Sequence, residues 1–120
     1  MNETRVFKSA DFFQEVDGEP IRSVVTESAD TVVVAWYVKP NQEIAPHMHP
    51  RGQDTWTILR GRGKYYLDQS GTTTTIAAGD IVIAPTGCVH GVLNDGEEPL
   101  VFISTVSPAN AGYQSVQRNE

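Results

Sequence analysis

The chain has 120 residues, of which 39% are apolar and 20% are charged. This balance excludes a disordered chain, and the length excludes two independent catalytic domains, because a chain of this size buries roughly two-thirds of its unfolded surface in one core. Fifteen acidic against nine basic residues leave a formal net charge of −6, which argues against a surface devoted to nucleic acid or to an anionic membrane. We therefore expect one globular domain with no nucleic-acid partner and no membrane partner.

The longest apolar runs of the chain are too short to cross a membrane. Residues 32–38 and 81–85 are strand-sized, far below the ~18 apolar residues of a membrane helix. The chain starts Met-Asn-Glu-Thr-Arg, without the basic start and the apolar segment of a signal peptide. Cys88 is the only cysteine, so no intrachain disulfide can form. These features predict a cytoplasmic protein.

Residues 1–30 are predicted to be an N-terminal extension that packs on the rest of the domain with a strand and a short helix. Ser9 is a candidate N-cap, and Ala10–Val16 is long enough for two helical turns. Gly18 and Pro20 then end the helix.

From residue 21 onward the chain consists of short segments rich in Val, Ile, Thr and aromatic residues, and Pro, Gly and Asn separate them. Many short strands at this spacing predict an all-β sandwich or barrel, which we place at residues 31–108. Residues 109–120 are small and polar and are predicted to form a loosely held C-terminal tail. The predicted strands are Ile21–Thr26, Thr31–Lys39, Thr55–Arg60, Lys64–Asp68, Thr72–Ile76, Asp80–Ala84, His90–Leu93 and Leu100–Val106.

Two of the three histidines, His47 and His49, lie two positions apart after a proline. In a strand, residues two apart point to the same face of the sheet. Asp54 follows beyond a turn, and the same alternation places Trp56 and Ile58 on its face. The pattern therefore predicts that a carboxylate, two imidazoles and apolar side chains converge on one interior.

The same residues resemble the first sequence motif of the cupin family, G-x5-H-x-H-x3-4-E-x6-G. His47, His49 and Gly61 match their positions in this motif. Asp54 stands where the family usually has Glu, and Asn41 stands where the motif starts with Gly. Asn commonly replaces Gly in turns, so the second departure affects only a turn.

The second cupin motif, G-x5-P-x-G-x2-H-x3-N, matches this chain at every fixed position. The matching residues are Gly79, Pro85, Gly87, His90 and Asn94. The chain thus resembles a small, single-domain cupin of the metal-binding type. This resemblance implies an all-β, cupin-type double-stranded β-helix, which is a jelly-roll barrel.

The resemblance implies a metal site formed by His47, His49, Asp54 and His90. Imidazole and carboxylate ligands together suit a divalent ion such as Fe, Mn, Ni, Co or Zn and leave coordination positions open for water or substrate. Asp is one methylene shorter than Glu, so Asp54 reaches the metal either directly or through a water.

A metal in such a site would chelate a small oxygen-bearing substrate, such as a carboxylate, an enolate or a diol. Similar cupins act as dioxygenases, decarboxylases, isomerases or lyases, and the ligand set does not choose among these reactions. The alternative is a non-enzymatic module that binds or senses a small ligand or a metal. A third interpretation is a metal-free cupin whose histidines act directly as acid and base. Whether the protein is an enzyme stays open at this point.

Turnover would need a proton-transferring group beside the metal. The two motifs contain no spare carboxylate or histidine, so Tyr37, Tyr65 or a metal-bound hydroxide would have to serve. We interpret Cys88 as a small, partly buried side chain rather than a nucleophile, because every nearby base is assigned to the metal.

We also expect a homodimer. Similar single-domain cupins commonly pair, and the exposed edge strands of so short a barrel need cover. The β-rich segment Ile21–Lys39 is the natural candidate for the contact.

Overall fold

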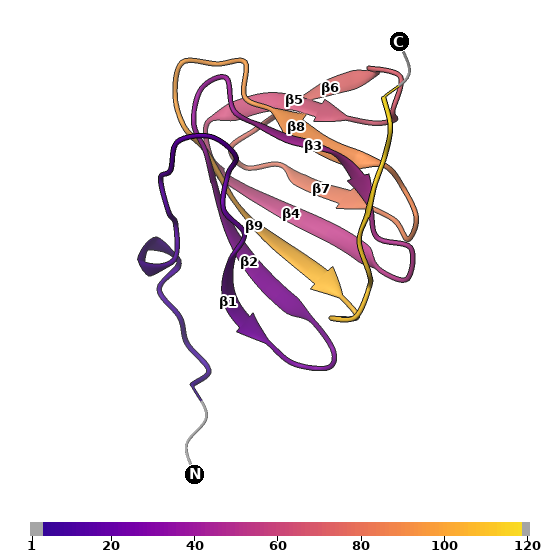
Figure 1. Cartoon of the computed structure of the whole chain (residues 1–120). Helices are drawn as coiled ribbons and strands as arrows, with labels where there is room; N and C mark the ends of the chain where they lie inside the picture. Colours follow the sequence, from indigo (N-terminus) through magenta and orange to yellow (C-terminus); the bar gives the residue numbers. More distant parts are fainter. Residues whose placement is uncertain (1–3, 119–120) are drawn as a thin grey trace.

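The computed structural model describes residues 4–118, and these form two antiparallel sheets of five strands each (Figure 1). Residues 1–3 and 119–120, the ends of the predicted extension and tail, lie outside the described residues. The strands are β1 (Ser23–Glu27), β2 (Val32–Val38), β3 (Glu43–Met48), β4 (Gln53–Arg60), β5 (Arg62–Tyr66), β6 (Thr73–Ala77), β7 (Ile81–Ala84), β8 (His90–Leu93), β9 (Leu100–Ser107) and β10 (Gln114–Ser115).

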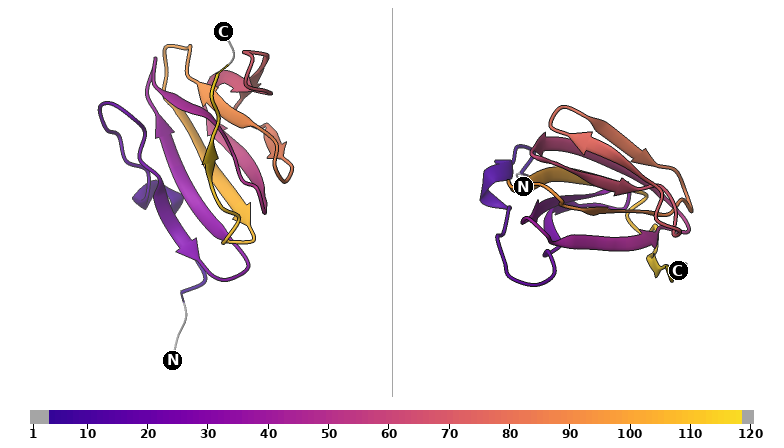
Figure 2. Two further views of the ribbon diagram at one scale, coloured as in Figure 1. Left: turned by 45° about the vertical axis from the view of Figure 1, so that its right-hand side comes forward. Right: turned by 90° about the horizontal axis from the view of Figure 1, so that it is seen from above.

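The order of strands is β1-β2-β9-β4-β7 in the first sheet and β10-β3-β8-β5-β6 in the second. From β2 to β9 the chain crosses to the other sheet at every connection except the β5–β6 hairpin. The two sheets therefore face each other as a jelly roll (Figure 2). The predicted all-β double-stranded β-helix is confirmed.

Each of the eight predicted strands overlaps a strand of the structure, but β3 was not predicted because Pro46 interrupts it. Proline cannot donate a ladder hydrogen bond, and it is tolerated in a sheet mainly at edges and bulges. The pairing of β3 with β8 shifts register between Ile44 and His47, so Pro46 lies at such an irregularity. Gly91 in β8 permits the close approach, since a Cβ there would lie 2.5 Å from the Ile44 carbonyl oxygen.

The N-terminal extension contains one 3-10 turn, Ser9–Asp11, in place of the two helical turns predicted over Ala10–Val16. The N-cap position is Lys8, which makes no capping hydrogen bond, so Ser9 does not cap a helix. Gln42 instead donates a 2.7 Å hydrogen bond from Nε2 to the Val16 carbonyl. A helix of two turns is marginal in water without tertiary packing of an apolar face, so other backbone contacts compete with it. Within residues 4–118, no helix has the length and apolar character needed to span a membrane.

The core consists of the inward-facing side chains of both sheets. In β4 the buried residues are Asp54, Trp56 and Ile58, as the alternation predicted. Trp56 stacks on Phe102 with ring centroids 4.2 Å apart. One core cluster comprises Val38, Trp56, Ile58, Tyr65, Ile76, Val92, Leu100 and Phe102. A second, smaller cluster comprises Val32, Val34, Val106 and Ala111.

The described part of the segment predicted as a C-terminal tail, residues 109–118, makes backbone contacts with the rest of the domain. Ala111 is buried, and its carbonyl accepts a 2.8 Å hydrogen bond from the Arg51 amide. Strand β10 then pairs with β3, with Ser115 opposite His47. Figure 1 shows this segment, in yellow, running from β9 across to the other sheet. Small polar composition did not reveal these backbone contacts, which involve residues far away in the sequence.

Candidate metal centre

The four predicted ligands come from three strands that the fold brings together. His47 lies near the end of β3, His49 directly follows this strand, and His90 starts β8. His47 and His90 are paired across β3 and β8, whereas Asp54 projects from β4 in the facing sheet. One ligand-type atom from each of the four residues lies within 4.8 Å of the others. The structure therefore places the predicted site residues in a single cluster between the sheets.

All three histidine rings are oriented by the backbone. Each ring places its Nδ1 against a carbonyl oxygen. The pairs are His47 with Ala45 at 2.9 Å, His49 with Gly112 at 2.7 Å and His90 with Cys88 at 3.0 Å. A carbonyl oxygen can only accept a hydrogen bond, so Nδ1 carries the proton in each ring. The Nε2 lone pairs are then free to bind a metal.

The Asp54 carboxylate lies where these lone pairs meet. Its Oδ2 is 3.0 Å from Nε2 of His90 and 3.4 Å from Nε2 of His49. Its Oδ1 accepts a 2.5 Å hydrogen bond from the Ser104 hydroxyl. The shorter side chain of Asp54 thus reaches the histidines without an intervening group.

This arrangement places hydrogen-bond acceptors, the histidine Nε2 atoms and the Asp54 carboxylate, against one another. With Nδ1 protonated, Nε2 of each histidine and Oδ2 of Asp54 are all lone-pair donors, and such atoms repel one another unless a proton or a cation lies among them. The side chains of Asp54 and His90 are 5% and 1% exposed, so water cannot screen them. Three neutral imidazoles and one carboxylate fit a divalent cation, which would satisfy the whole donor set at once.

The protonation states of the cluster follow from burial and from its hydrogen bonds. Burial, assisted by the nearby His90, lowers the pKa of His47 to about 4. The hydrogen bond with Asp54 raises the pKa of His49 against the effect of burial. Burial raises the pKa of Asp54, but the Ser104 hydroxyl and, when their rings carry a second proton, the Nε2–H groups of His49 and His90 donate hydrogen bonds to the carboxylate and hold this pKa below its usual value. Near neutral pH, His47 is neutral and Asp54 is anionic, which are the states that metal binding requires.

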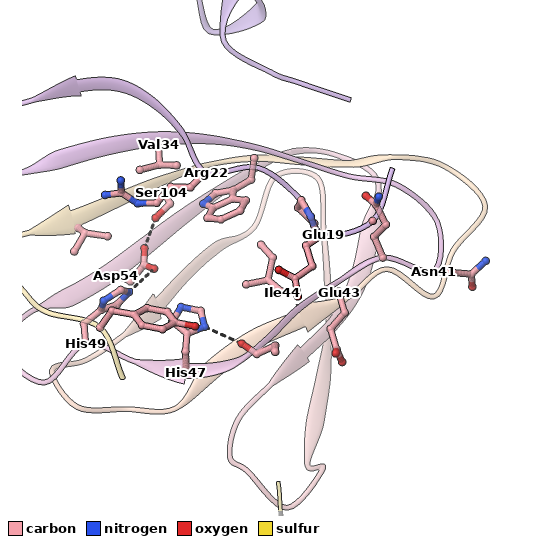
Figure 3. A pocket seen from close by; sticks show the side chains of 17 residues that line it. Glu19, Arg22, Val34, Asn41, Glu43, Ile44, His47, His49, Asp54 and Ser104 are labelled. Carbon is pink, nitrogen blue, oxygen red and sulfur yellow. Dashed lines mark hydrogen bonds and ion pairs between the residues drawn. The ribbon is translucent and has the colours of Figure 1, made fainter. Parts of the chain in front are cut away.

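A cavity of about 440 Å³ opens beside the cluster (Figure 3). His47, His49, Asp54 and Ser104 form its polar end. Apolar side chains form a wall, and these are Val34, Trp36, Ile44 and Val106. Cavities of this size and mixed lining typically bind small molecules.

Both terminal segments also contribute residues that the motif analysis missed. Tyr113 stacks on the His47 ring, with centroids 5.2 Å apart and an interplanar angle of 23°. Arg22 and Glu19, from the segment before β1, line the cavity. A lone aromatic residue in a small, polar segment was the available signal for Tyr113. The sequence offered no comparable signal for Arg22 or Glu19.

Tyr37, Tyr65 and Cys88, which the sequence suggested as candidate proton-transfer groups or as a partly buried thiol, lie in other surroundings than expected. Tyr37 and Tyr65 do not line the cavity. Tyr65 is in the core with its ring edge-to-face against Trp56, and burial raises its pKa. Cys88 is exposed rather than partly buried, and its backbone carbonyl is what orients His90. The Cys88 side chain projects outward because the loop uses its backbone to hold the histidine.

The other motif residues shape the backbone around the site. Asn41 has φ of 71°, a left-handed conformation that Asn tolerates, which explains how it replaces the motif's glycine. Gly61 has φ of 81°, and a Cβ there would lie 2.2 Å from the Pro99 carbonyl oxygen. Asn94 is fully buried and donates a 2.9 Å hydrogen bond from Nδ2 to the Val38 carbonyl. These residues hold turns and strands in place and do not contact the cluster.

Comparison with known proteins finds both solved structures and curated proteins that are similar to this chain. A solved structure from Klebsiella pneumoniae subsp. pneumoniae, an uncharacterized conserved protein with a double-stranded beta-helix domain, is 48% identical. It superposes with a TM-score of 0.92, covering 97% of this chain and 100% of that chain. Germin-like protein 4-1 of Oryza sativa subsp. japonica is 35% identical over 85 residues, which are 64% of this chain and 34% of the relative.

The HTH-type transcriptional regulator AlkR of Acinetobacter baylyi is 38% identical over 82 residues, which are 66% of this chain and 26% of the regulator. The chain therefore spans about a third or less of the length of these two curated relatives. The family model described as Cupin domain matches residues 34–106, which include all four residues of the cluster. The chain belongs to the cupin family.

Proposed function

We propose that this cupin binds one divalent metal through Nε2 of His47, His49 and His90 and through the carboxylate of Asp54. The carrying observation is that all three Nδ1 atoms are committed to backbone carbonyls, so that the three lone pairs turn toward one buried carboxylate. The metal would be Fe, Mn, Ni, Co or Zn, since borderline ions suit mixed imidazole and carboxylate donors. When bound, such an ion supplies Lewis-acid chemistry or, if it is redox-active, electron transfer.

The cavity beside the cluster would hold a small oxygen-bearing ligand such as a carboxylate, an enolate or a diol. Ser104 fixes the Asp54 carboxylate through Oδ1 and leaves Oδ2 directed at the histidines. The apolar wall, which includes Val34 and Trp36, excludes water from one side of the bound molecule. The chain thus provides an anchor for oxygen atoms at one end of an otherwise partly apolar site.

A catalytic role, such as dioxygenation, decarboxylation, isomerisation or lyase chemistry, needs a group that moves protons within the cavity. Glu19 and Tyr113 line the cavity and replace Tyr37 and Tyr65 as candidates for this task. These two residues come from the segments that flank the β-helix, so any proton transfer would involve groups outside the strands that carry the cluster.

The second candidate function is a non-enzymatic ligand-sensing module. The matching segment of the transcriptional regulator amounts to 26% of that protein, which supports the use of such a barrel as one part of a regulator. A screen of small carboxylates and catechols, followed by oxygen uptake and product analysis, separates the two functions. Turnover of any compound favours the enzyme, whereas saturable binding without turnover favours the sensor.

Metal analysis of protein purified without added metal tests the proposal itself. We expect about one divalent ion per chain in the wild type and in Cys88→Ser, a control that removes the exposed thiol near the site. The double variant His47→Ala/His49→Ala should lose the ion. Equal metal contents in the wild type and the double variant would contradict the metal site and favour histidines that act as acid and base by themselves.

A further inference from the structure

Arg22 lies at the cavity without a role in the proposed metal centre. It precedes β1 and lines the cavity together with the histidine cluster. Figure 3 shows Arg22 beside Ser104, on the side of the cavity occupied by Asp54 and His49, whereas Glu43 lies further away. Among the described residues that line this cavity, Arg22 is the one with a permanent positive charge.

The charge of Arg22 is not neutralised by a neighbour. Within residues 4–118, no ion pair or side-chain hydrogen bond joins Arg22 to another residue, not even to Glu19 on the same cavity wall. Two other cations are paired, since Lys39 lies 2.7 Å from Asp17 and Arg118 forms an ion pair with Glu43, whereas Arg22 is exposed and lines the cavity without such a partner. The five N–H donors of the Arg22 guanidinium are therefore available to a ligand.

Arg22 is also close enough to act electrostatically on the cluster. Arg22 lines the same cavity as His49 and Asp54, and Figure 3 shows it beside Ser104, whose hydroxyl donates a hydrogen bond to the Asp54 carboxylate. A divalent cation with a single carboxylate ligand keeps a net positive charge, and Arg22 adds a second positive centre to the same cavity. Glu19 and Glu43 also line the cavity, but Glu43 is paired with Arg118 and Figure 3 shows it away from Arg22. The two positive centres therefore suit an anion that carries negative charge at two separated points.

We infer that Arg22 forms a second anchoring point, and that the cavity takes a small organic acid with a metal-chelating end and a distal carboxylate bound by the Arg22 guanidinium. This inference rests on the proposed metal centre. Guanidinium and carboxylate match in a planar, bidentate geometry, which makes arginine suited to this recognition. The cavity of about 440 Å³ has room for a compound of this class.

The test uses zinc-loaded protein, without excess zinc, and three 2-hydroxy acids measured by isothermal titration calorimetry. Lactate has the chelating group alone, while malate and 2-hydroxyglutarate add a distal carboxylate at two distances. We expect at least one of the two diacids to bind the wild type about tenfold or more tightly than lactate does. Arg22→Gln should lose this gain, so that the variant binds the two diacids no more tightly than it binds lactate. Arg60→Gln, which removes the same charge from an exposed position outside the cavity, should keep the gain.

The outcomes separate this inference from the proposed function. If Arg22→Gln retains the gain, or if the wild type binds all three acids equally, the second anchoring point is wrong while the metal centre stands. If Arg60→Gln loses the gain as fully as Arg22→Gln, the effect belongs to overall charge and the inference is again overturned. If the wild type takes up no zinc, the metal centre fails and the inference fails with it.

Discussion

Burial of His47 makes the metal-free protein sensitive to mild acid. The ring is held in the folded protein with a pKa of about 4, against 6.5 for an exposed histidine. As the pH falls below 6.5, the His47 ring therefore becomes protonated in the unfolded chain but stays neutral in the folded chain. The free energy of unfolding must decrease through the window from pH 6.5 to 4, because protons stabilise the state that binds them.

The magnitude follows from the two pKa values. The interval from 6.5 to about 4, at about 1.4 kcal/mol for each pH unit, corresponds to at most about 3.5 kcal/mol. For a domain of this size, that loss lowers Tm by roughly 10 to 15 °C. His49 does not cancel the effect. Its pKa is raised in the folded state, so its contribution is already complete below pH 6.5 and constant through the window.

Urea denaturation of chelator-treated protein at pH 7, 5.5 and 4.5 measures this loss. The control is His47→Gln, which keeps a polar side chain of similar size but does not titrate, and whose unfolding free energy should vary much less across the window. A flat stability profile in the wild type would refute the buried, neutral His47. The same refutation follows if His47→Gln loses as much stability on acidification as the wild type does.

Three further predictions concern the metal, the cavity and the assembly. Asp54→Ala should weaken metal affinity by about tenfold or more in a chelator competition assay. Asp54→Glu should weaken it too, because the Asp54 carboxylate already contacts Nε2 of His90 and a longer side chain overfills the site. Wild-type affinity in both variants would exclude the carboxylate from the site. Tyr113→Ala removes the ring that stacks on His47 and should speed metal release to a chelator by about two- to tenfold, measured by stopped flow; an unchanged release rate would show that the ring does not shield the site. The homodimer expected from the sequence stays a prediction. Strand β1 is the candidate contact because it is the edge strand of its sheet, whereas β2 is covered by β1 and β9. Light scattering should give a dimer mass, and a monomer mass across a hundredfold dilution would contradict the prediction.

The fold and the four-residue cluster could be predicted because their signals are local. Alternation along β4 places Asp54, Trp56 and Ile58 on one face whatever the rest of the chain does. The two-residue spacing of His47 and His49 likewise predicts that both rings project to the same side of the chain. Their match to His90 across the barrel came from the family resemblance, which carries long-range information that periodicity lacks.

The surroundings of the cluster could not be predicted because they depend on contacts over long sequence distances. The carbonyl that orients His49 belongs to Gly112, 63 residues away. Every residue type has a backbone carbonyl, so the sequence cannot indicate which carbonyl accepts a hydrogen bond from a given histidine. Strand β3 was missed for a related reason, since Pro46 normally argues against a strand and is accommodated only by the shifted pairing with β8.

The residues of the cluster and the residues that surround it come from different parts of the chain, and this bears on function. All four members of the cluster lie within residues 34–106, the part of the chain that matches the cupin family. Arg22 and Tyr113, which face the cavity, lie outside that range on either side of it. The β-helix therefore provides the four side chains of the proposed metal centre, and the flanking segments provide further groups that line the cavity. If the proposed metal centre is right, two cupins with the same histidine cluster can differ in ligand through short terminal segments alone, without any change in the strands that carry the cluster.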